Sequence, residues 1–287
     1  MFQPDASGST CPQVGILRHF FRDWTTYVPQ RDLPQVTPAL LRRLPPSAIT
    51  RTRYLKGLHD AMMVHPCFNF RHFEQRIDAM MAWGEANDLS KQKTDLAREL
   101  FGAVNGAPKK SPGLASTSPK PTLSFFAAAS AALALGAIMA RDPAEPTKER
   151  HTPATLFALS KQSLFLFEET STYDVDSVIA MLLQALYLLH DGQMRIEHTV
   201  FPLVGKMINV ARMMGLAVDP DEFPGTYSLF EAETRRRIWW DIVYYDMVVS
   251  DSMGHPSLIT ETSFSTKIPR DVEESLFTPS STTIPPP

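Results

Sequence analysis

Two His-Asp dipeptides, His59-Asp60 and His190-Asp191, carry the side chains best suited to metal chemistry in this chain. An imidazole and a carboxylate can share a cation for hydrolysis when other helices supply the remaining ligands. His190-Asp191, however, comes directly before Gly192 at a predicted helix end, where an imidazolium complements the negative end of the helix dipole. We therefore expect this pair to cap a helix. A helical metal-dependent hydrolase using His59/Asp60 and His190/Asp191 stays as an alternative.

A second group of ligand-type side chains comprises His65, Cys67 and His72. These residues are close in sequence, but no second cysteine pair completes a tetrahedral zinc site. The chain also has no Gly-rich phosphate loop, no Gly-x-Ser-x-Gly elbow and no His-Glu-x-x-His pattern. The sequence therefore predicts no catalytic residue and no metal or cofactor held by this chain.

Three aspartates, Asp241, Asp246 and Asp251, repeat at five-residue spacing. On a helix, that spacing turns each carboxylate by about 140° from the previous one, so the three do not converge on a magnesium ion. Asp246 differs from the others because it stands alone inside an apolar run. A buried carboxylate needs a partner, and we expect Asp246 to make a structural ion pair or a helix-cap bond rather than to contact a ligand.

The same segment begins with charged residues. Ser228 and Glu231 form a capping box for a helix that Gly254 and Pro256 end. Within the arginine triplet 235–237, Arg235 lies at i,i+4 spacing from Glu231, and Arg237 lies at that spacing from Glu233 and Asp241. This spacing favours ion pairs on a solvated face. We therefore expect this first half of the helix to be solvated, and replacement of Arg236 to have little effect on stability.

From Ile238 onward the helix is apolar almost all round. Trp239 and Trp240 point about 100° apart. Both are buried only if neighbours surround the helix on two sides, which we expect where this half enters the core.

Helical periodicity dominates the chain, and no segment alternates over the length of a strand. We expect helices at about 47–65, 71–87, 91–104, 121–140, 153–167, 175–190, 199–214 and 228–253. Short connections between several of them predict an all-α, multi-helix array of antiparallel helix hairpins.

Composition divides the chain into three parts: an irregular segment 1–43, a domain 44–272, and a tail 273–287 that we expect to be disordered. Inside the domain, the Pro/Ser/Lys-rich stretch 105–122 predicts a flexible loop. The uncharged stretch 121–140 is long enough to span a bilayer. Its many alanines favour a core helix instead, because alanine drives membrane insertion weakly.

The 287 residues are 44% hydrophobic, enough for a sizeable core. A formal net charge of -3 provides no global attraction to nucleic acid, so we expect no sequence-specific DNA binding by this chain alone. Two cysteines, Cys11 and Cys67, cannot form a disulfide scaffold or a cysteine-rich zinc module. The thirteen methionines indicate a soft core, and an apolar ligand pocket would use them as well.

A set of motifs occurs in a fixed order along the chain. Leu44-Pro45-Pro46 comes first, Ala211-Arg212-Met-Met-Gly215-Leu216 follows, and a Glu-x-Arg-Arg-Arg-x-Trp-Trp run then precedes Tyr-Asp and Gly-x-Pro. The residues of this last part are Glu233, Arg235, Arg236, Arg237, Trp239, Trp240, Asp246, Gly254 and Pro256. Over roughly residues 44–272 the pattern resembles the fungal-specific transcription factor domain, the all-helical middle homology region of fungal zinc-cluster regulators.

The resemblance implies a non-enzymatic regulatory domain of a nuclear transcription factor. Such a domain senses an effector and contacts other transcription-factor domains or transcriptional co-regulators. The resemblance also allows a homodimer and a small apolar effector, and it implies no contact with a membrane. In the family, DNA and zinc are bound by a separate module with six cysteines around two zinc ions. The two cysteines here cannot build that module. The family domain usually continues into more helices, whereas this chain stops at Pro285-Pro286-Pro287, so a truncated or remodelled gene product is one interpretation.

Two positions depart from the family pattern. His255 stands where the family usually has arginine between Gly and Pro, and Met247 stands where it has arginine after the Asp. The resemblance therefore leaves the role of Asp246 open. Besides the hydrolase, a ligand-free helical scaffold stays as an alternative, which a core without a cavity would favour.

Overall fold

The computed structural model describes residues 34–62, 67–88, 120–140, 151–193 and 196–285. Within these ranges the regular structure is helical and contains no strand, which confirms the all-α class. The α-helices are α2 (Pro38–Leu41), α3 (Ala48–Met62), α4 (Phe70–Ala86), α6 (Leu123–Met139), α7 (Pro153–Thr170), α8 (Val175–His190), α9 (Phe201–Met213) and α10 (Leu229–Ser252). A π-helical turn, Ile196–Val200, leads into α9, and two short 3-10 turns are Pro220–Glu222 and Glu261–Ser263. The helix predicted at 91–104 and most of the loop predicted at 105–122 lie outside the described residues.

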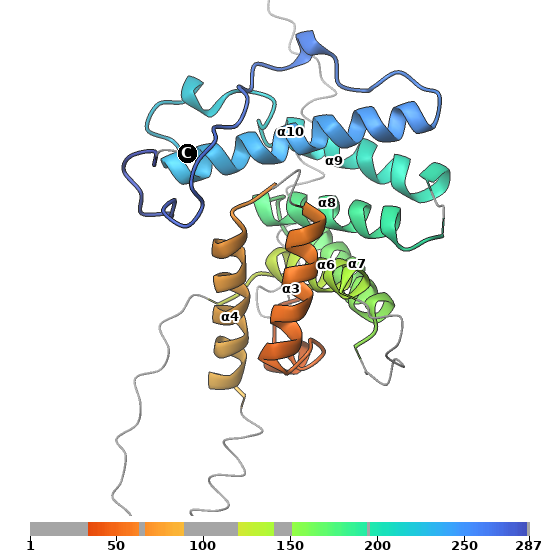
Figure 1. The fold of residues 1–287 in the computed structure, drawn as a ribbon, viewed down its shortest axis with the longest axis vertical. Coiled ribbons are helices and arrows are strands. Elements are labelled where there is room, and N and C mark those ends of the chain that lie inside the picture. Colours follow the sequence, from red (N-terminus) through yellow and green to blue (C-terminus); the bar gives the residue numbers. More distant parts are fainter. Residues whose placement is uncertain (1–33, 63–66, 89–119, 141–150, 194–195, 286–287) are drawn as a thin grey trace, which may run out of the picture. The chain divides into compact units, whose positions relative to one another are not determined.

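Helix α6 is the centre of the core. Every residue from Leu123 to Ala137 is buried, so the helix has no polar face. Figure 1 shows it among α3, α7 and α8, the helices that it contacts most. The core-helix prediction for 121–140 is therefore confirmed, and none of the described helices has the length and hydropathy that a membrane span requires.

Two glycines set how closely α3 and α6 approach. A Cβ atom added at Gly136 would lie 1.9 Å from the backbone oxygen of Tyr54, and one added at Gly57 would lie 2.7 Å from the backbone oxygen of Gly136. Only glycine permits this approach, because the backbones themselves are in contact. The alanines of α6 extend the same close packing along the helix.

Capping side chains start the helices where the sequence predicts them. Asp174 and Ser177 form a capping box at the start of α8, and Ser228 and Glu231 form one at the start of α10. Asn69 accepts a hydrogen bond from the amide of His72 at 2.8 Å and so caps α4. These bonds satisfy amides that have no partner inside the helix.

The two ends of the domain differ from the prediction. Val36 and Leu41 are buried in the main core, so the compact unit begins at Val36 and includes α2, ahead of residue 44. Residues 273–285, predicted to be disordered, pack against the domain: Phe277 is 4% exposed and forms a cluster with Phe230 and Val272. The prediction of disorder is wrong because the composition of the segment does not show that a single aromatic side chain, Phe277, packs into a buried cluster of the domain.

The glycine contact gives a first prediction. Gly136→Ala should destabilise the chain by about 1–3 kcal/mol or more, because the added methyl group overlaps the Tyr54 carbonyl group and forces the two helices apart. Gly205→Ala on α9 is a matched control, since its Cβ would lie 3.8 Å from the nearest atom, a Leu258 methyl carbon. The control should be neutral or slightly stabilising, because alanine is the better helix former. Urea denaturation checks both, and equal midpoints would contradict the close-contact argument.

Candidate functional site

A buried ion pair lies under the arginine triplet. The guanidinium of Arg236 is 1% exposed and donates two hydrogen bonds to the Asp219 carboxylate, from Nε at 3.0 Å and from Nη2 at 2.8 Å. Nη2 also lies 2.8 Å from Asp221 Oδ1, and Nη1 lies 3.5 Å from Glu233 Oε2. The bonds from Arg236 hold the pKa of Asp219 well below its usual range. Asp219 is therefore a carboxylate throughout the physiological pH range.

The prediction of a solvated triplet is wrong for Arg236. Its side chain enters the core, and the ion pairs differ from the expected i,i+4 set: Arg237 pairs with Glu274, and Arg236 with Asp219. Glu231 instead accepts from the amide and hydroxyl groups of Ser228 in the capping box. Surface ion pairs contribute little to stability, whereas a bidentate buried pair fixes the geometry of both elements it joins.

The same carboxylates hold a distant segment of the chain. The amide of Lys267 donates to Asp219 Oδ2 at 2.8 Å, and the amide of Arg270 donates to Glu233 Oε1 at 2.6 Å. Trp240 Nε1 donates to the Lys267 carbonyl oxygen at 2.8 Å. Residues 267–270 are therefore fixed along α10 by two side chains of the Glu-x-Arg-Arg-Arg-x-Trp-Trp run, Glu233 and Trp240, together with Asp219.

The two tryptophans have different surroundings. Trp239 is fully buried and its ring contacts Phe264 with centroids 5.6 Å apart. Trp240 is only partly buried and meets the edge of the same Phe264 ring at 5.6 Å. The expectation of burial thus holds in full for Trp239 and in part for Trp240.

Asp246 is held by structural hydrogen bonds, but these are neither the expected ion pair nor a helix cap. Its carboxylate is fully buried and accepts from the amides of Leu258 at 3.1 Å and Ile259 at 2.7 Å, and from the Ser250 hydroxyl at 3.2 Å. Gly254, with a φ of 67°, ends α10 and allows the chain to fold back to these donors. Pro256 is exposed within that turn. In this chain the partners of Asp246 are backbone amides rather than an arginine.

The metal-type clusters do not converge. His59 and Asp60 are more than half exposed on α3, and His190 Nδ1 bonds the Leu186 carbonyl oxygen at the end of α8. Asp191 caps the amide of Gln193 at 2.9 Å. Among the described residues no three His, Cys, Asp or Glu side chains are placed to hold a metal ion. His65 lies outside the described residues.

Asp241 is a buried carboxyl group that sequence analysis did not distinguish. It lies next to Cys67, whose side chain is fully buried, and Asp241 Oδ2 has no hydrogen-bond partner. Burial raises the pKa of Asp241 to about 8, although the Cys67 thiol and Arg237 act in the opposite direction. Burial and the nearby Asp241 raise the pKa of Cys67. Both groups are therefore neutral at low pH, and neither is an activated nucleophile.

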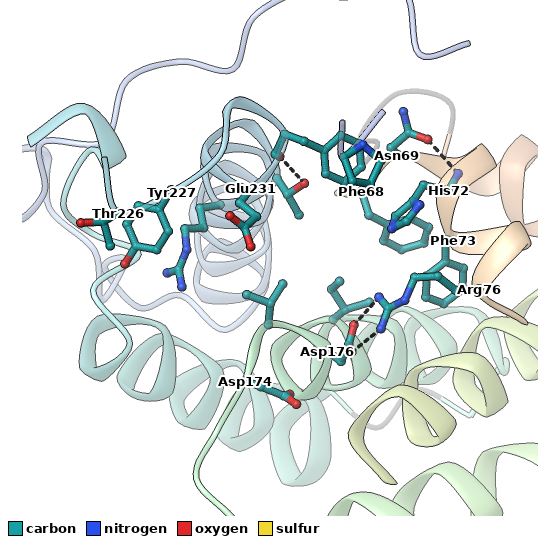
Figure 2. A pocket seen from close by; sticks show the side chains of 16 residues that line it. Phe68, Asn69, His72, Phe73, Arg76, Asp174, Asp176, Thr226, Tyr227 and Glu231 are labelled. Carbon is teal, nitrogen blue, oxygen red and sulfur yellow. Dashed lines mark hydrogen bonds and ion pairs between the residues drawn. The ribbon is translucent and has the colours of Figure 1, made fainter. Parts of the chain in front are cut away.

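A cavity of about 530 Å³ lies where α4, α8 and α10 begin (Figure 2). Its apolar wall consists of Phe68, Phe73, Val175, Ile179 and Phe230, and Pro279 of the C-terminal segment lies at its edge. The polar side chains that line it are Asn69, His72, Arg76, Asp174, Asp176, Thr226, Tyr227, Glu231, Thr234 and Arg235. Volumes of this size are typical of sites for small molecules.

Most charges around the cavity are already paired or capped. Arg76 makes two bonds to Asp176, at 2.7 and 2.6 Å, which Figure 2 shows as dashed lines. Asp174 accepts from the Ser124 hydroxyl at 2.7 Å and from the Ser177 amide at 2.8 Å. Burial, followed by the charge of Arg76, lowers the pKa of His72, so its ring is mainly neutral near pH 7.

Arg235, from the Glu-x-Arg-Arg-Arg-x-Trp-Trp run, is the exception among these charges. Its guanidinium lies 4.2 Å from the centroid of the Tyr227 ring, and Nη1 is 3.4 Å from the Met214 carbonyl oxygen. No carboxylate of the described residues pairs with it. The sequence placed Arg235 on a solvated face, whereas the structure places it at the edge of the cavity.

The buried pair gives a second prediction. Arg236→Ala should lower the free energy of unfolding by about 3–5 kcal/mol, because Asp219 and Glu233 would stay buried without their cation. Arg71→Ala, at an exposed position of α4, is the control and should change stability by less than about 0.5 kcal/mol. Thermal unfolding compares the two, and a small effect of Arg236→Ala would restore the solvated interpretation.

Asp241 gives a third prediction. Its folded pKa of about 8 exceeds the ordinary value of about 4, so the folded chain keeps a proton that the unfolded chain releases. The resulting stability is complete below about pH 4 and declines as the pH rises toward 8. Urea denaturation at about pH 5 and about pH 7.5 should show a smaller decline in Asp241→Asn than in the wild-type chain. Asp251→Asn, at an exposed position, should keep the wild-type decline, and an unchanged decline in Asp241→Asn would refute the assignment.

Comparison with known proteins places these features in a family. The family model described as the fungal specific transcription factor domain matches residues 65–285 and so includes the packed segment after residue 272. The pyrrolocin cluster transcription factor of a fungal species (strain NRRL 50135) is 31% identical over 147 residues, which cover 50% of this chain and 18% of that protein.

Two further relatives show the same extent of similarity. The equisetin cluster transcription factor of Fusarium heterosporum is 31% identical over 112 residues, 39% of this chain and 15% of that protein. A Zn(2)-C6 fungal-type transcription factor of Monascus ruber is 29% identical over 119 residues, 42% of this chain and 14% of that protein. The matched segment is thus less than a fifth of each of these relatives, and no solved structure is significantly similar to the chain. The chain belongs to the family of the fungal specific transcription factor domain.

Proposed function

We propose that this chain is the regulatory part of a nuclear transcription factor and that it senses a small molecule through the cavity at the start of α4, α8 and α10. In this proposal DNA is contacted by a separate zinc-containing module. The regulatory part acts through other transcription-factor domains, through co-regulators or through a second copy of the chain.

The observation that supports sensing is the position of the cavity. Its walls come from the first two turns of three helices and the residues just before them, and Pro279 adds the C-terminal segment. Asn69 caps α4 and also donates to the carbonyl oxygens of Glu274 at 3.1 Å and Phe277 at 3.2 Å. A molecule in the cavity would therefore touch the residues that hold the C-terminal segment against the helices. Differential contacts of this kind are what a ligand needs to shift a conformational equilibrium.

The relatives support the transcriptional part of the proposal. Their names describe transcription factors, including those of the pyrrolocin and equisetin clusters. The net charge of -3 gives this chain no general attraction for DNA, which is consistent with DNA contact through another module.

Neither alternative is favoured by the geometry. For the hydrolase, the His-Asp pair at residues 59–60 is exposed on α3, and the pair at 190–191 makes capping bonds at the end of α8. For the ligand-free scaffold, which a structure without a pocket would favour, the domain instead has a partly open cavity of about 530 Å³ with an aromatic wall.

A reporter assay tests the proposal. The whole chain, fused to a heterologous DNA-binding module, should change reporter transcription relative to the module alone. Val175→Trp, which fills the cavity from the first turn of α8, should change the level or its dependence on growth medium. Ile49→Trp, at a site that is 84% exposed, is the matched control and should behave as wild type.

Two outcomes of this assay contradict the proposal. If the fusion leaves transcription at the level of the module in every medium, the chain is not regulatory in this context. If Val175→Trp and Ile49→Trp give the same output as the wild-type chain, the cavity takes no part in regulation. Thermal melting of both variants shows whether the tryptophan at residue 175 fits without unfolding the domain.

A further inference from the structure

We infer that the cavity selects an amphipathic, singly charged anion, with its acid group at Arg235 and its apolar body on the aromatic wall. This inference rests on the proposed function, because it names the ligand class of the same cavity.

Arg235 supplies the first argument. A guanidinium has five N–H donors, and the described contacts of Arg235 occupy one of them, with a long bond of 3.4 Å to the Met214 carbonyl oxygen. The stacking on Tyr227 holds the guanidinium plane in place without using a donor. The side chain is partly buried, so its charge is less solvated than that of a surface arginine. A carboxylate or sulfonate group matches these donors in geometry and charge.

The acidic residues of the cavity do not offer an equivalent site for a cation. Asp176 has both oxygens bonded to Arg76, and Asp174 has both oxygens bonded to serine donors. Glu231 accepts from Ser228 at Oε2, and its Oε1 belongs to an exposed residue, where water solvates it. Asp174 is the N-cap of α8 and Glu231 lies in the first turn of α10, where each helix dipole supplies about half a positive charge. The lining holds three carboxylates and two guanidiniums. Among those charged groups that are not exposed, Arg235 has the most unused hydrogen-bonding capacity, and that capacity is for donation.

The apolar wall restricts the rest of the ligand. The rings of Phe68 and Phe73 are stacked with centroids 4.3 Å apart, and Phe230 also lines the cavity. Such a surface favours an aromatic or long aliphatic body. A polyphosphate or dicarboxylate would need further cations, and Arg76 is already paired with Asp176. A neutral apolar molecule would cover Arg235 without replacing its water, which costs free energy.

Two matched fluorescent probes test the inference on the whole chain. 1-Anilinonaphthalene-8-sulfonate carries an aromatic body and one negative charge, and N-phenyl-1-naphthylamine has the same body without the sulfonate. Arg235→Gln should weaken binding of the sulfonate probe about tenfold and change binding of the neutral probe by less than about twofold. Arg235→Lys keeps the charge and should retain most of the affinity for the sulfonate probe. Arg71→Gln removes an exposed charge outside the cavity and should affect neither probe.

The outcomes separate this inference from the proposed function. Val175→Trp should weaken both probes; if it weakens neither, the cavity is not a ligand site and the sensing proposal fails with the inference. If Val175→Trp weakens both probes but Arg235→Gln affects them equally or not at all, the cavity stands and the anion assignment is overturned. If Arg235→Gln melts at a lower temperature than the wild type, its weaker binding could come from partial unfolding. The test is then the salt dependence of probe binding to the wild-type chain. Added NaCl should weaken only the sulfonate probe on the wild-type chain, and equal salt dependence would overturn the inference.

Discussion

The ion pair between Arg236 and Asp219 is the interaction on which the arrangement around α10 depends. Both side chains are about 1% exposed, so each charge is costly unless the other is present. Asp219 also accepts the amides of Asp221 and Lys267, and the partner of Arg236 on its own helix, Glu233, accepts the amide of Arg270. One buried guanidinium thus fixes a loop that precedes α10 and a segment that follows it. The helix keeps its position because the segments before and after it both bond to the charge cluster of Arg236, Asp219 and Glu233.

The arginine triplet connects this core to the rest of the site. Successive residues of a helix point about 100° apart, so the three guanidiniums reach three different surroundings. Arg235 lies at the cavity, Arg236 in the core, and Arg237 at Glu274 of the C-terminal segment. A sequence of three identical residues is therefore not one charged patch. It is a turn of helix that contacts the cavity, the core and the C-terminal segment at once.

Local signals in the sequence were sufficient for much of the fold. Capping residues such as Asp174 and Ser228 act within three residues, and an all-apolar helix such as α6 has to be buried whatever its neighbours are. The partners of Arg236 and Arg237 were not predictable in this way, because Asp219 and Glu274 are brought to them by the fold. The helix pattern around the triplet indicated i,i+4 pairs, and tertiary contacts replaced them. The cavity was missed for the same reason, since its lining comes from three helices and a segment whose Pro- and Ser-rich composition indicated disorder.

The C-terminal segment shares its contacts with the cavity, and this has a thermodynamic consequence. Glu274 bonds the amide of Phe70 at the start of α4 and the guanidinium of Arg237, while Asn69 holds the carbonyl oxygens of Glu274 and Phe277. Asn69 and Pro279 also line the cavity. A ligand that binds more tightly when Asn69 and Pro279 line the cavity favours the state in which the C-terminal segment is packed against the domain. By linkage, the docked segment raises the affinity for that ligand by the same factor. The link would require no movement of the core, because Arg236 and Asp219 hold α10 fixed while Arg235 lines the cavity and Arg237 pairs with the C-terminal segment.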